Sequence, residues 1–318
     1  MFLSMHNWMR AEPIETTIRR LSKFGFESIE ISGEPEKYNT KEVLKLLKEN
    51  KVNCWGSVTL MFEGRDLIHA DPQVRENSVK YIKGIVTMVH EMEGRIVTIV
   101  PSQVGKVVPM ASPEEEWQWA VEGLREIYAH SEPLGVTLAI EPLNRFETNF
   151  LNRHDQALLL AQEVGPHCGI ALDAFHINIE EADLYKAVSN AGKRLADFHV
   201  ADNNRMAPGQ GDYNWAKLIK TLDEAGYKYA LTLEFVAPID RTPANPYKNA
   251  LGTSDKELTP EQLKFIQDHG SGVLSEEFYS WLVGESAKTL RKAMKKAGVE
   301  ETRVPKQVKV SRSARAVA

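Results

Sequence analysis

The chain has few cysteines and no long apolar run. Only two cysteines, Cys54 and Cys168, occur in 318 residues, which excludes a disulfide framework and predicts a reducing compartment. No stretch approaches the roughly 18 consecutive apolar residues that a membrane helix needs. The N-terminal residues MFLSMHNWMR lack a charged leader followed by an apolar segment. These absences predict a cytoplasmic protein that has no membrane partner.

The sequence also lacks an excess of positive charge. Its 39 lysines and arginines oppose 44 aspartates and glutamates, which gives a net charge of −5. This balance offers no electrostatic reason to expect a nucleic acid as partner. Hydrophobic residues make up 42% of the chain, so it can bury a large core, and its length suits a single barrel domain.

Two kinds of apolar segment alternate along the chain. Eight short runs are typical of buried strands, and the stretches between them have the apolar period of amphipathic helices. Eight strand–helix repeats predict an α/β protein with a (β/α)8 TIM barrel. The expected strands are 1–6, 28–32, 53–60, 95–101, 136–142, 168–176, 195–202 and 230–235. The expected helices are 13–24, 40–50, 72–92, 113–133, 153–164, 181–192, 214–226 and 274–298.

Two segments fall outside this repeat. Residues 236–273 interrupt the last strand–helix unit and contain four prolines. An insertion at this place lies on the same face as the strand ends, so we expect it to act as a lid or a subunit contact. The tail, 302–318, is basic and has no apolar period, which predicts a mobile arm or a contact arm. The expected organisation is one catalytic barrel over 1–301 that carries this insertion and this tail.

Four side chains with metal-binding groups stand near the ends of the last four expected strands. They are Glu141, Asp173, His199 and Glu234, separated by 32, 26 and 35 residues, about the length of one strand–helix unit. The ends of successive parallel strands converge on one mouth of a barrel, so these side chains are expected to meet. Three carboxylates and one imidazole suit Mn²⁺, Co²⁺ or Mg²⁺ better than a thiolate-binding metal. The pattern predicts a divalent metal centre, with Mn²⁺ as the first choice.

The same residues predict a reaction. A divalent metal that chelates a carbonyl and a neighbouring hydroxyl oxygen stabilises the enediolate formed when the adjacent C–H proton is removed. Glu141 and Glu234 are expected on opposite sides of the barrel mouth, where they could take and return that proton as catalytic groups. Arg205 offers a rigid fork of donors to sugar or enolate oxygens. These residues predict a keto-sugar epimerase or isomerase.

Four strings surround these residues: EPLNRFETNFL (141–151), LDAFHINIEE (172–181), DFHVADNNRMAPGQGDYNW (197–215) and LEF (233–235). They resemble the sugar isomerase/epimerase family of xylose isomerase-like barrels, and within it the D-tagatose and D-allulose 3-epimerases. The resemblance implies that Glu141 and Glu234 bind the metal and also move protons. It implies that Asp173 and His199 bind the metal only.

The resemblance also implies a set of substrate contacts. Glu147, six residues after the first ligand, matches a residue near the reactive end of the substrate; the alternative is an ion pair with a nearby arginine. His176 and Arg205 match residues that bind substrate oxygens. His6 ends the first expected strand and Phe235 adjoins a ligand, so we expect both to line the pocket.

The chain is also similar to the catalytic subunit of bacterial C-glycoside deglycosidases. These enzymes cleave the carbon–carbon bond between a 3-keto-sugar and an aglycone, and they pair with a smaller subunit. The opening MHNWM and the long insertion differ from the free-ketose epimerases. The alternative function is therefore β-elimination from 3-keto-C-glycosides. An epimerase would be a homo-oligomer acting on a small sugar, whereas a deglycosidase would be a hetero-oligomer.

Two further classes remain open. A DNA-repair endonuclease of the same superfamily would need a cluster of several zinc ions with many histidines and a basic groove, and neither is indicated here. A catalytically inactive barrel is the other class, and the intact acid and base candidates argue against it.

Overall fold

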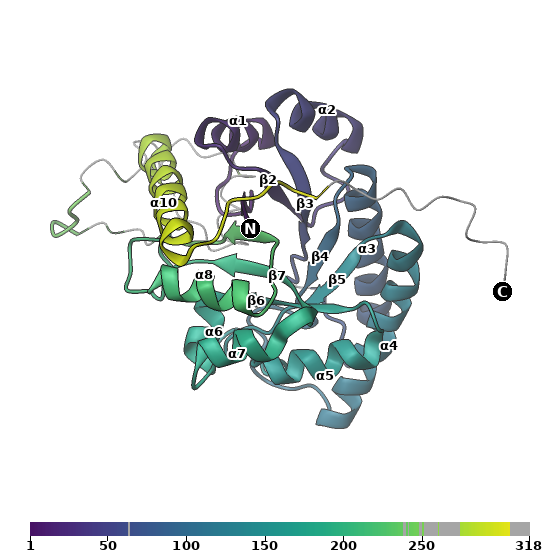
Figure 1. Cartoon of the computed structure of the whole chain (residues 1–318). Helices are drawn as coiled ribbons and strands as arrows, with labels where there is room; N and C mark the ends of the chain where they lie inside the picture. The colour runs from purple at the N-terminus through teal and green to yellow at the C-terminus, as the bar shows by residue number, and fades with distance from the viewer. Residues whose placement is uncertain are drawn as a thin grey trace.

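The computed structural model describes residues 1–62, 64–237, 240, 242–247, 250, 260 and 274–305. In these residues, eight parallel strands form a nearly closed barrel (Figure 1). The strands run in chain order from β2 to β8, β1 pairs with β8, and β1 meets β2 at an isolated bridge between His6 and Glu30. The predicted (β/α)8 barrel is confirmed. The strands are β1 (Phe2–Met5), β2 (Ser28–Ser32), β3 (Asn53–Val58), β4 (Ile96–Ile99), β5 (Thr137–Ile140), β6 (Gly169–Asp173), β7 (Leu195–Val200) and β8 (Ala230–Leu233).

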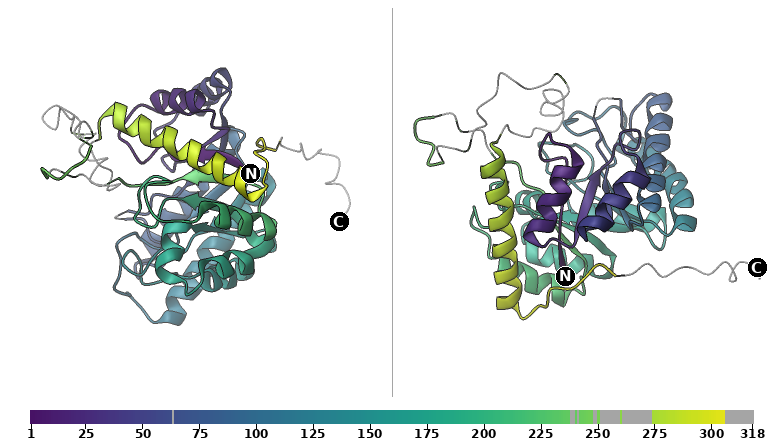
Figure 2. Two further views of the ribbon diagram at one scale, coloured as in Figure 1. Left: turned by 60° about the vertical axis from the view of Figure 1, so that its left-hand side comes forward. Right: turned by 90° about the horizontal axis from the view of Figure 1, so that it is seen from above.

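Helices surround the strands on the outside of the barrel (Figures 1 and 2). The last helix, α10, packs against both α8 and α1 and so completes the outer ring. The helices are α1 (Ile14–Phe24), α2 (Thr40–Asn50), α3 (Pro72–Glu91), α4 (Pro113–Ser131), α5 (His154–Val164), α6 (Ala174–Glu180), α7 (Leu184–Ala191), α8 (Trp215–Glu224) and α10 (Glu276–Ala297). Two short 3₁₀ helices, η1 (Glu132–Leu134) and η2 (Gly192–Arg194), lead into β5 and β7.

Local chemistry fixes most helix ends where the sequence predicts them. The side chain of Ser112 accepts a hydrogen bond from the backbone N–H of Glu115, whose carboxylate accepts one from Ser112, and Pro113 then begins α4. At the other end of a helix, Gly25 ends α1 with a φ of 71°, a conformation that glycine adopts without strain. Such end signals explain why the predicted helices lie within a few residues of those observed.

Alternation along the strands separates two apolar cores. Outward side chains such as Leu3 and Met5 pack beneath the helices in one large core. Ala139 and Ala171 belong to a second, smaller cluster, and they precede Glu141 and Asp173 by two residues, so they share the inward face of their strands. This cluster forms an apolar floor in the barrel below the strand ends. Its members are Phe2, Trp55, Ile96, Ala139, Ala171 and Ala230.

One predicted element boundary is wrong. The strand expected over 168–176 ends at Asp173, and α6 begins at the next residue. Asp173 itself caps this helix, because its Oδ1 accepts a hydrogen bond from the backbone N–H of Phe175 at 2.8 Å. His176 therefore lies on the first turn of a helix and not on a strand.

The insertion and the tail are described only in part. Leu251 and most of 236–273, and all of 306–318, lie outside the described residues, so the predicted lid and contact arm stay predictions. The start of the tail runs beside the N-terminus, where the backbone N–H of Thr302 donates to the carbonyl oxygen of Met1 at 2.7 Å. Val304 packs against the apolar floor of the barrel. Within the described residues, no helix combines the length and apolar character needed to cross a bilayer.

Candidate metal centre and active site

The four predicted metal ligands come together at one mouth of the barrel. Glu141 directly follows β5, Asp173 ends β6, His199 lies on β7 and Glu234 directly follows β8. One ligand atom from each lies within 4.8 Å of the corresponding atoms of the other three, and all four residues are buried. The barrel topology thus converts a spacing of one strand–helix unit in sequence into a compact cluster in space.

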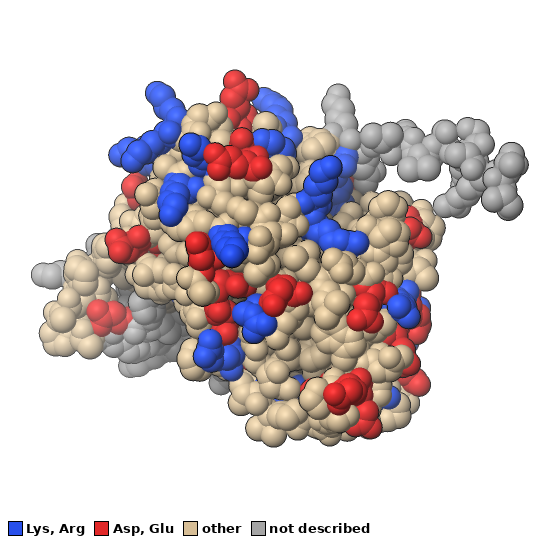
Figure 3. All heavy atoms as spheres, turned by 60° about the horizontal axis from the view of Figure 1, so that its bottom comes forward, with Lys and Arg blue, Asp and Glu red and all other residues tan. Residues whose placement is uncertain are grey.

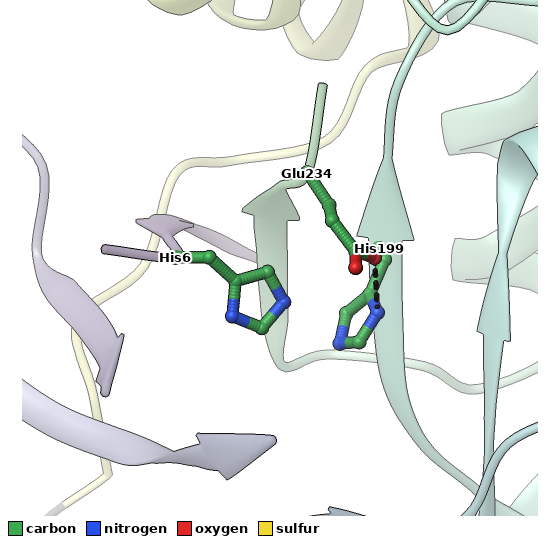
Figure 4. Close-up of side chains that lie close together, drawn as sticks. All are labelled: His6, His199 and Glu234. Atoms are coloured by element: carbon green, nitrogen blue, oxygen red, sulfur yellow. Dashed lines mark ion pairs between the residues drawn. The ribbon is translucent and has the colours of Figure 1, made fainter. Parts of the chain in front are cut away.

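The imidazole of His199 stands at the centre of this cluster. Its Nδ1 lies 2.8 Å from Oε2 of Glu234 (Figure 4). The same nitrogen lies 3.1 Å from Oε1 of Glu141. Asp173 completes the group and forms an ion pair with Arg205. The guanidinium of Arg205 also reaches Oε1 of Glu234 at 3.6 Å. The two predicted catalytic carboxylates, Glu141 and Glu234, therefore approach the same nitrogen from different strands.

Burial and neighbouring charges shift the ionisation of the cluster. Burial raises the pKa of Glu234 to about 7. Burial also acts to raise the pKa of Asp173, but the guanidinium of Arg205 outweighs it and holds this pKa well below its usual range. Burial acts to lower the pKa of His199, and the carboxylates of Glu141 and Glu234 reverse this and hold it well above its usual range. Shifts of this size are typical of functional sites.

The donor set fits a divalent cation. Three carboxylates and one imidazole nitrogen supply mostly hard oxygen ligands. Oε2 of Glu234 is buried and accepts no hydrogen bond from the described residues, although it lies close to His199. A buried acceptor of this kind needs a partner, and a cation at the centre of the cluster would provide it.

A cavity of about 450 Å³ opens above the cluster. Glu141 and Glu234 line it, as do three of the predicted substrate contacts, Glu147, His176 and Arg205. The rest of the wall is largely apolar, and ten of its 16 lining residues carry apolar side chains. This combination of an apolar wall with a few converging polar groups is the usual form of a small-molecule site.

Asn144 connects two of the predicted substrate contacts. Its Nδ2 donates to Oε1 of Glu147 at 2.7 Å and lies 2.9 Å from Nδ1 of His176. Nε2 of His176 lies 3.7 Å from Asp173. The arginines near Glu147 in sequence pair elsewhere, since Arg145 binds Glu180 and Arg153 binds Asp155. The carboxylate of Glu147 is thus turned toward the cavity and not held in a surface ion pair.

A tight loop after β7 holds Arg205 in place. The carboxylate of Asp202 accepts hydrogen bonds from the backbone N–H groups of Gly209 at 2.7 Å and Tyr213 at 3.0 Å. Arg205 has a φ of 61°, a conformation that non-glycine residues rarely adopt. Its guanidinium stacks 4.8 Å from the ring centre of Phe175. These contacts fix the fork of donors at the cavity wall.

The structure places the other two predicted substrate contacts away from the cavity wall. His6 is fully buried, and its ring lies beside that of His199, with 4.6 Å between the ring centres (Figure 4). Phe235 is 1% exposed and packs toward Tyr279, 5.6 Å between ring centres. Successive residues of an extended segment point to opposite sides, so Phe235 faces the helices when Glu234 faces the mouth. Neither residue is among those that line the cavity.

Sequence reasoning missed two buried carboxylates next to the centre. Glu30 on β2 and Asp197 on β7 are fully buried and lie within reach of the second nitrogen of His199. A signal for both exists in the sequence, because Glu30 interrupts the apolar run SIEIS and Asp197 precedes His199 by two residues on the same strand face. Phe175 also lines the cavity without having been expected there.

Known proteins similar to this chain are named as epimerases. It is 29% identical over 226 residues to a D-psicose 3-epimerase of Enterocloster bolteae, which covers 68% of this chain and 74% of that enzyme. It is 28% identical over 250 residues to a 3-dehydro-D-guloside 4-epimerase of Escherichia coli, covering 76% and 93%. The structure of D-psicose 3-epimerase with D-tagatose from Clostridium cellulolyticum H10 has the same fold, with a TM-score of 0.75 at 21% identity over 92% of this chain and 99% of that one.

The family match covers most of the barrel. Residues 18–269 match the family described as the xylose isomerase-like TIM barrel. This span includes seven of the eight strands and all four predicted ligands. The resemblance noted in the sequence is thereby confirmed, and the chain belongs to the xylose isomerase-like TIM barrel family.

Proposed function

We propose that the chain is a metal-dependent keto-sugar epimerase or isomerase that removes a proton next to a carbonyl. One observation carries the proposal: Glu141 and Glu234 approach the same nitrogen of His199 from different strands, and both line the cavity. Two carboxylates so placed can take a proton from a bound sugar and return it. Relatives named as epimerases of D-psicose and of 3-dehydro-D-guloside support this reaction class.

The metal in this proposal is held by Glu141, Asp173, His199 and Glu234. When bound, it supplies positive charge that polarises a carbonyl and stabilises an enediolate. The oxygen-rich donor set favours Mn²⁺, with Co²⁺ or Mg²⁺ as substitutes.

The remaining polar residues of the cavity orient the sugar. Arg205 presents two fixed N–H donors to a sugar oxygen, and its ion pair with Asp173 prevents it from turning away. His176 and Glu147, connected through Asn144, bind hydroxyl groups at the reacting end. The apolar wall excludes water around the carboxylates, which strengthens each polar contact made inside.

A second candidate function is supported by the apolar wall. The cavity of the catalytic carboxylates is also lined by Trp8, Met61, Phe62 and Phe175, and a small free ketose offers little apolar surface to them. A 3-keto-C-glycoside would place its aglycone against this wall. Proton removal beside its keto group could then lead to β-elimination of the carbon-linked aglycone. The chain would in that case be the catalytic subunit of a C-glycoside deglycosidase.

The two candidates are separated by products. Purified chain loaded with Mn²⁺ is incubated in D₂O with free ketoses and, separately, with 3-keto-C-glycosides. An epimerase converts a ketose into its epimer and introduces solvent deuterium at the carbon next to the carbonyl. A deglycosidase releases the aglycone and leaves ketoses unchanged.

Retention of all substrate hydrogen in an epimerised or isomerised product would contradict proton transfer and indicate a hydride shift. Glu141→Gln should lose this turnover. The matched control is Glu49→Gln, which makes the same chemical change at an exposed residue of α2 and should retain full turnover.

A further inference from the structure

The second nitrogen of His199 faces a pair of buried carboxylates. Nε2 of His199 lies 3.4 Å from Oδ2 of Asp197 and 3.5 Å from Oε2 of Glu30. All three side chains are fully buried inside the barrel. Buried carboxylates are costly unless they are paired, so their presence here needs an explanation.

Hydrogen bonds from three strands fix the two carboxylates. Asp197 accepts from the indole N–H of Trp55 at 3.1 Å and from the hydroxyl group of Thr98 at 3.0 Å. Glu30 accepts from the hydroxyl group of Thr232 through Oε1. Its other oxygen, Oε2, accepts no hydrogen bond in the described part of the chain. Each carboxylate is therefore anchored and keeps an oxygen directed toward His199.

Two irregularities in the sheet favour this arrangement. The register between β2 and β3 shifts beside Glu30, so that Trp55 is the extra residue of β3. The register between β6 and β7 shifts beside Asp197, so that Ala196 is the extra residue of β7. Bulges redirect the side chains near them, and here one directs an indole N–H to the carboxylate that faces His199.

His6 is the other cationic candidate near this pair. Its Nε2 lies 3.8 Å from Oε2 of Glu30, farther than Nε2 of His199 from the same atom. Of the two imidazoles, His199 is thus the better partner for the carboxylates.

We propose that Glu30 and Asp197 are positioning residues that hold His199 as a metal ligand. In the metal-bound protein they accept the hydrogen on Nε2, which leaves the lone pair of Nδ1 for the metal that Glu141, Asp173 and Glu234 also hold. An imidazole held in this way is oriented and more basic at its metal-facing nitrogen. This inference rests on the proposed metal-dependent function and adds two residues to it that touch neither the metal nor the substrate.

The test measures metal binding and not only turnover. The variants are Glu30→Gln and Asp197→Asn, which keep side-chain shape and replace each carboxyl group with an amide. Calorimetry with Mn²⁺ should give about 10- to 100-fold weaker binding in each variant with unchanged stoichiometry. The visible absorption spectrum of the Co²⁺-loaded protein should also change, because the orientation of His199 relaxes. Melting of the metal-free variants shows whether each of them folds.

The matched control is Glu116→Gln. Glu116 is 2% exposed and accepts a hydrogen bond from the backbone N–H of Met110 at 2.9 Å, and it is neither a predicted ligand nor a residue that lines the cavity. Its variant should keep the Mn²⁺ affinity of the wild type. If Asp197→Asn does not fold, Glu30→Gln carries the test on its own.

Three outcomes would overturn the inference. Unchanged Mn²⁺ affinity in both variants, with a wild type that binds one ion, would overturn the positioning role and leave the proposed function intact. A wild type that binds no divalent ion would overturn the proposed function and this inference together. A wild type that binds two ions and variants that bind one would show that Glu30 and Asp197 are themselves ligands.

Discussion

At the scale of single residues, the site depends on one imidazole held between two sets of carboxylates. Nδ1 of His199 faces Glu141 and Glu234, which line the cavity, and Nε2 faces Glu30 and Asp197 in the barrel interior. Acidic side chains at this density repel one another unless a cation lies among them. A divalent ion beside Glu141 and Glu234 would relieve this repulsion. This relief is the physical reason to expect metal dependence.

The first prediction concerns the ligands. Removal of metal with EDTA should abolish activity, and Mn²⁺, Co²⁺ or Mg²⁺ should restore it. Glu141→Gln and Glu234→Gln should each lower kcat by about 10²- to 10⁴-fold, because each removes a proton-transfer group. Asp173→Asn and His199→Ala should lose bound metal, measured by elemental analysis of the purified variants. Full activity in metal-free protein would contradict this prediction.

The second prediction concerns Arg205. Arg205→Lys keeps the charge but loses the planar fork, so kcat/KM should fall by about 10- to 100-fold, the equivalent of one or two charged hydrogen bonds. Steady-state kinetics gives the ratio, on whichever substrate the D₂O experiment shows to be turned over. The control is Arg145→Lys, in which an arginine with a 62% exposed side chain and a pairing to Glu180 is changed in the same way. Equal losses in both variants would argue against a specific role for Arg205.

At the scale of elements, close packing of strands determines where the ligands point. In β3, a Cβ added at Gly56 would lie 2.2 Å from the backbone oxygen of Ile96, so only glycine lets β3 and β4 approach as they do. Gly56 directly follows Trp55, the extra residue of β3 that bonds to Asp197. The close approach of β3 and β4 is therefore coupled to the position of Trp55, whose indole N–H bonds to the Asp197 carboxylate near His199.

The third prediction tests this coupling. Gly56→Ala should lower the free energy of unfolding by about 3 kcal/mol, because the clash is with backbone and not with a flexible side chain. Chemical denaturation of the metal-free protein measures the loss. The control is Gly84→Ala within α3, where the added Cβ would come no closer than 3.3 Å, to Cγ of Pro35, and alanine favours the helix. A Gly56→Ala protein as stable as the wild type would contradict the packing argument.

At the scale of the whole molecule, the chain closes on itself beside its own N-terminus. Helix α10 packs between α1 and α8, and the segment after it pairs with Met1 and covers the apolar floor with Val304 (Figure 2). On the face shown in Figure 3, basic and acidic side chains are interspersed, in line with a net charge near balance. The tail continues as 306–318, which lies outside the described residues.

The fourth prediction concerns that tail. Truncation after Pro305 should leave turnover, stability and native size unchanged if the chain is a self-contained homo-oligomeric epimerase. Truncation after Gly298 should lower the melting temperature, because it also removes the contacts of Thr302 and Val304. Size-exclusion chromatography of the native protein, with mass spectrometry of what co-elutes, gives the readout. A stoichiometric second polypeptide that is lost on truncation after Pro305 would instead support the deglycosidase.

The sequence by itself determined the strand–helix repeat and the places of the four predicted metal ligands within it. Strand and helix periods, helix-end signals and the spacing of Glu141, Asp173, His199 and Glu234 are local properties, so they can be read without knowing which strands pair. The barrel prediction then places the four strand ends at one mouth, because parallel strands in a closed sheet share a direction.

Only the tertiary structure decided how residues distant in the chain face one another. Asp173 ends its strand and caps α6, which turns His176 toward Asn144, and Phe235 turns to Tyr279 and away from the cavity. The pairing of Glu30 with His199 spans the barrel interior and depends on strand register and on bulges. No local pattern encodes such contacts, because they arise from the closure of the sheet and from the close approach of β3 and β4.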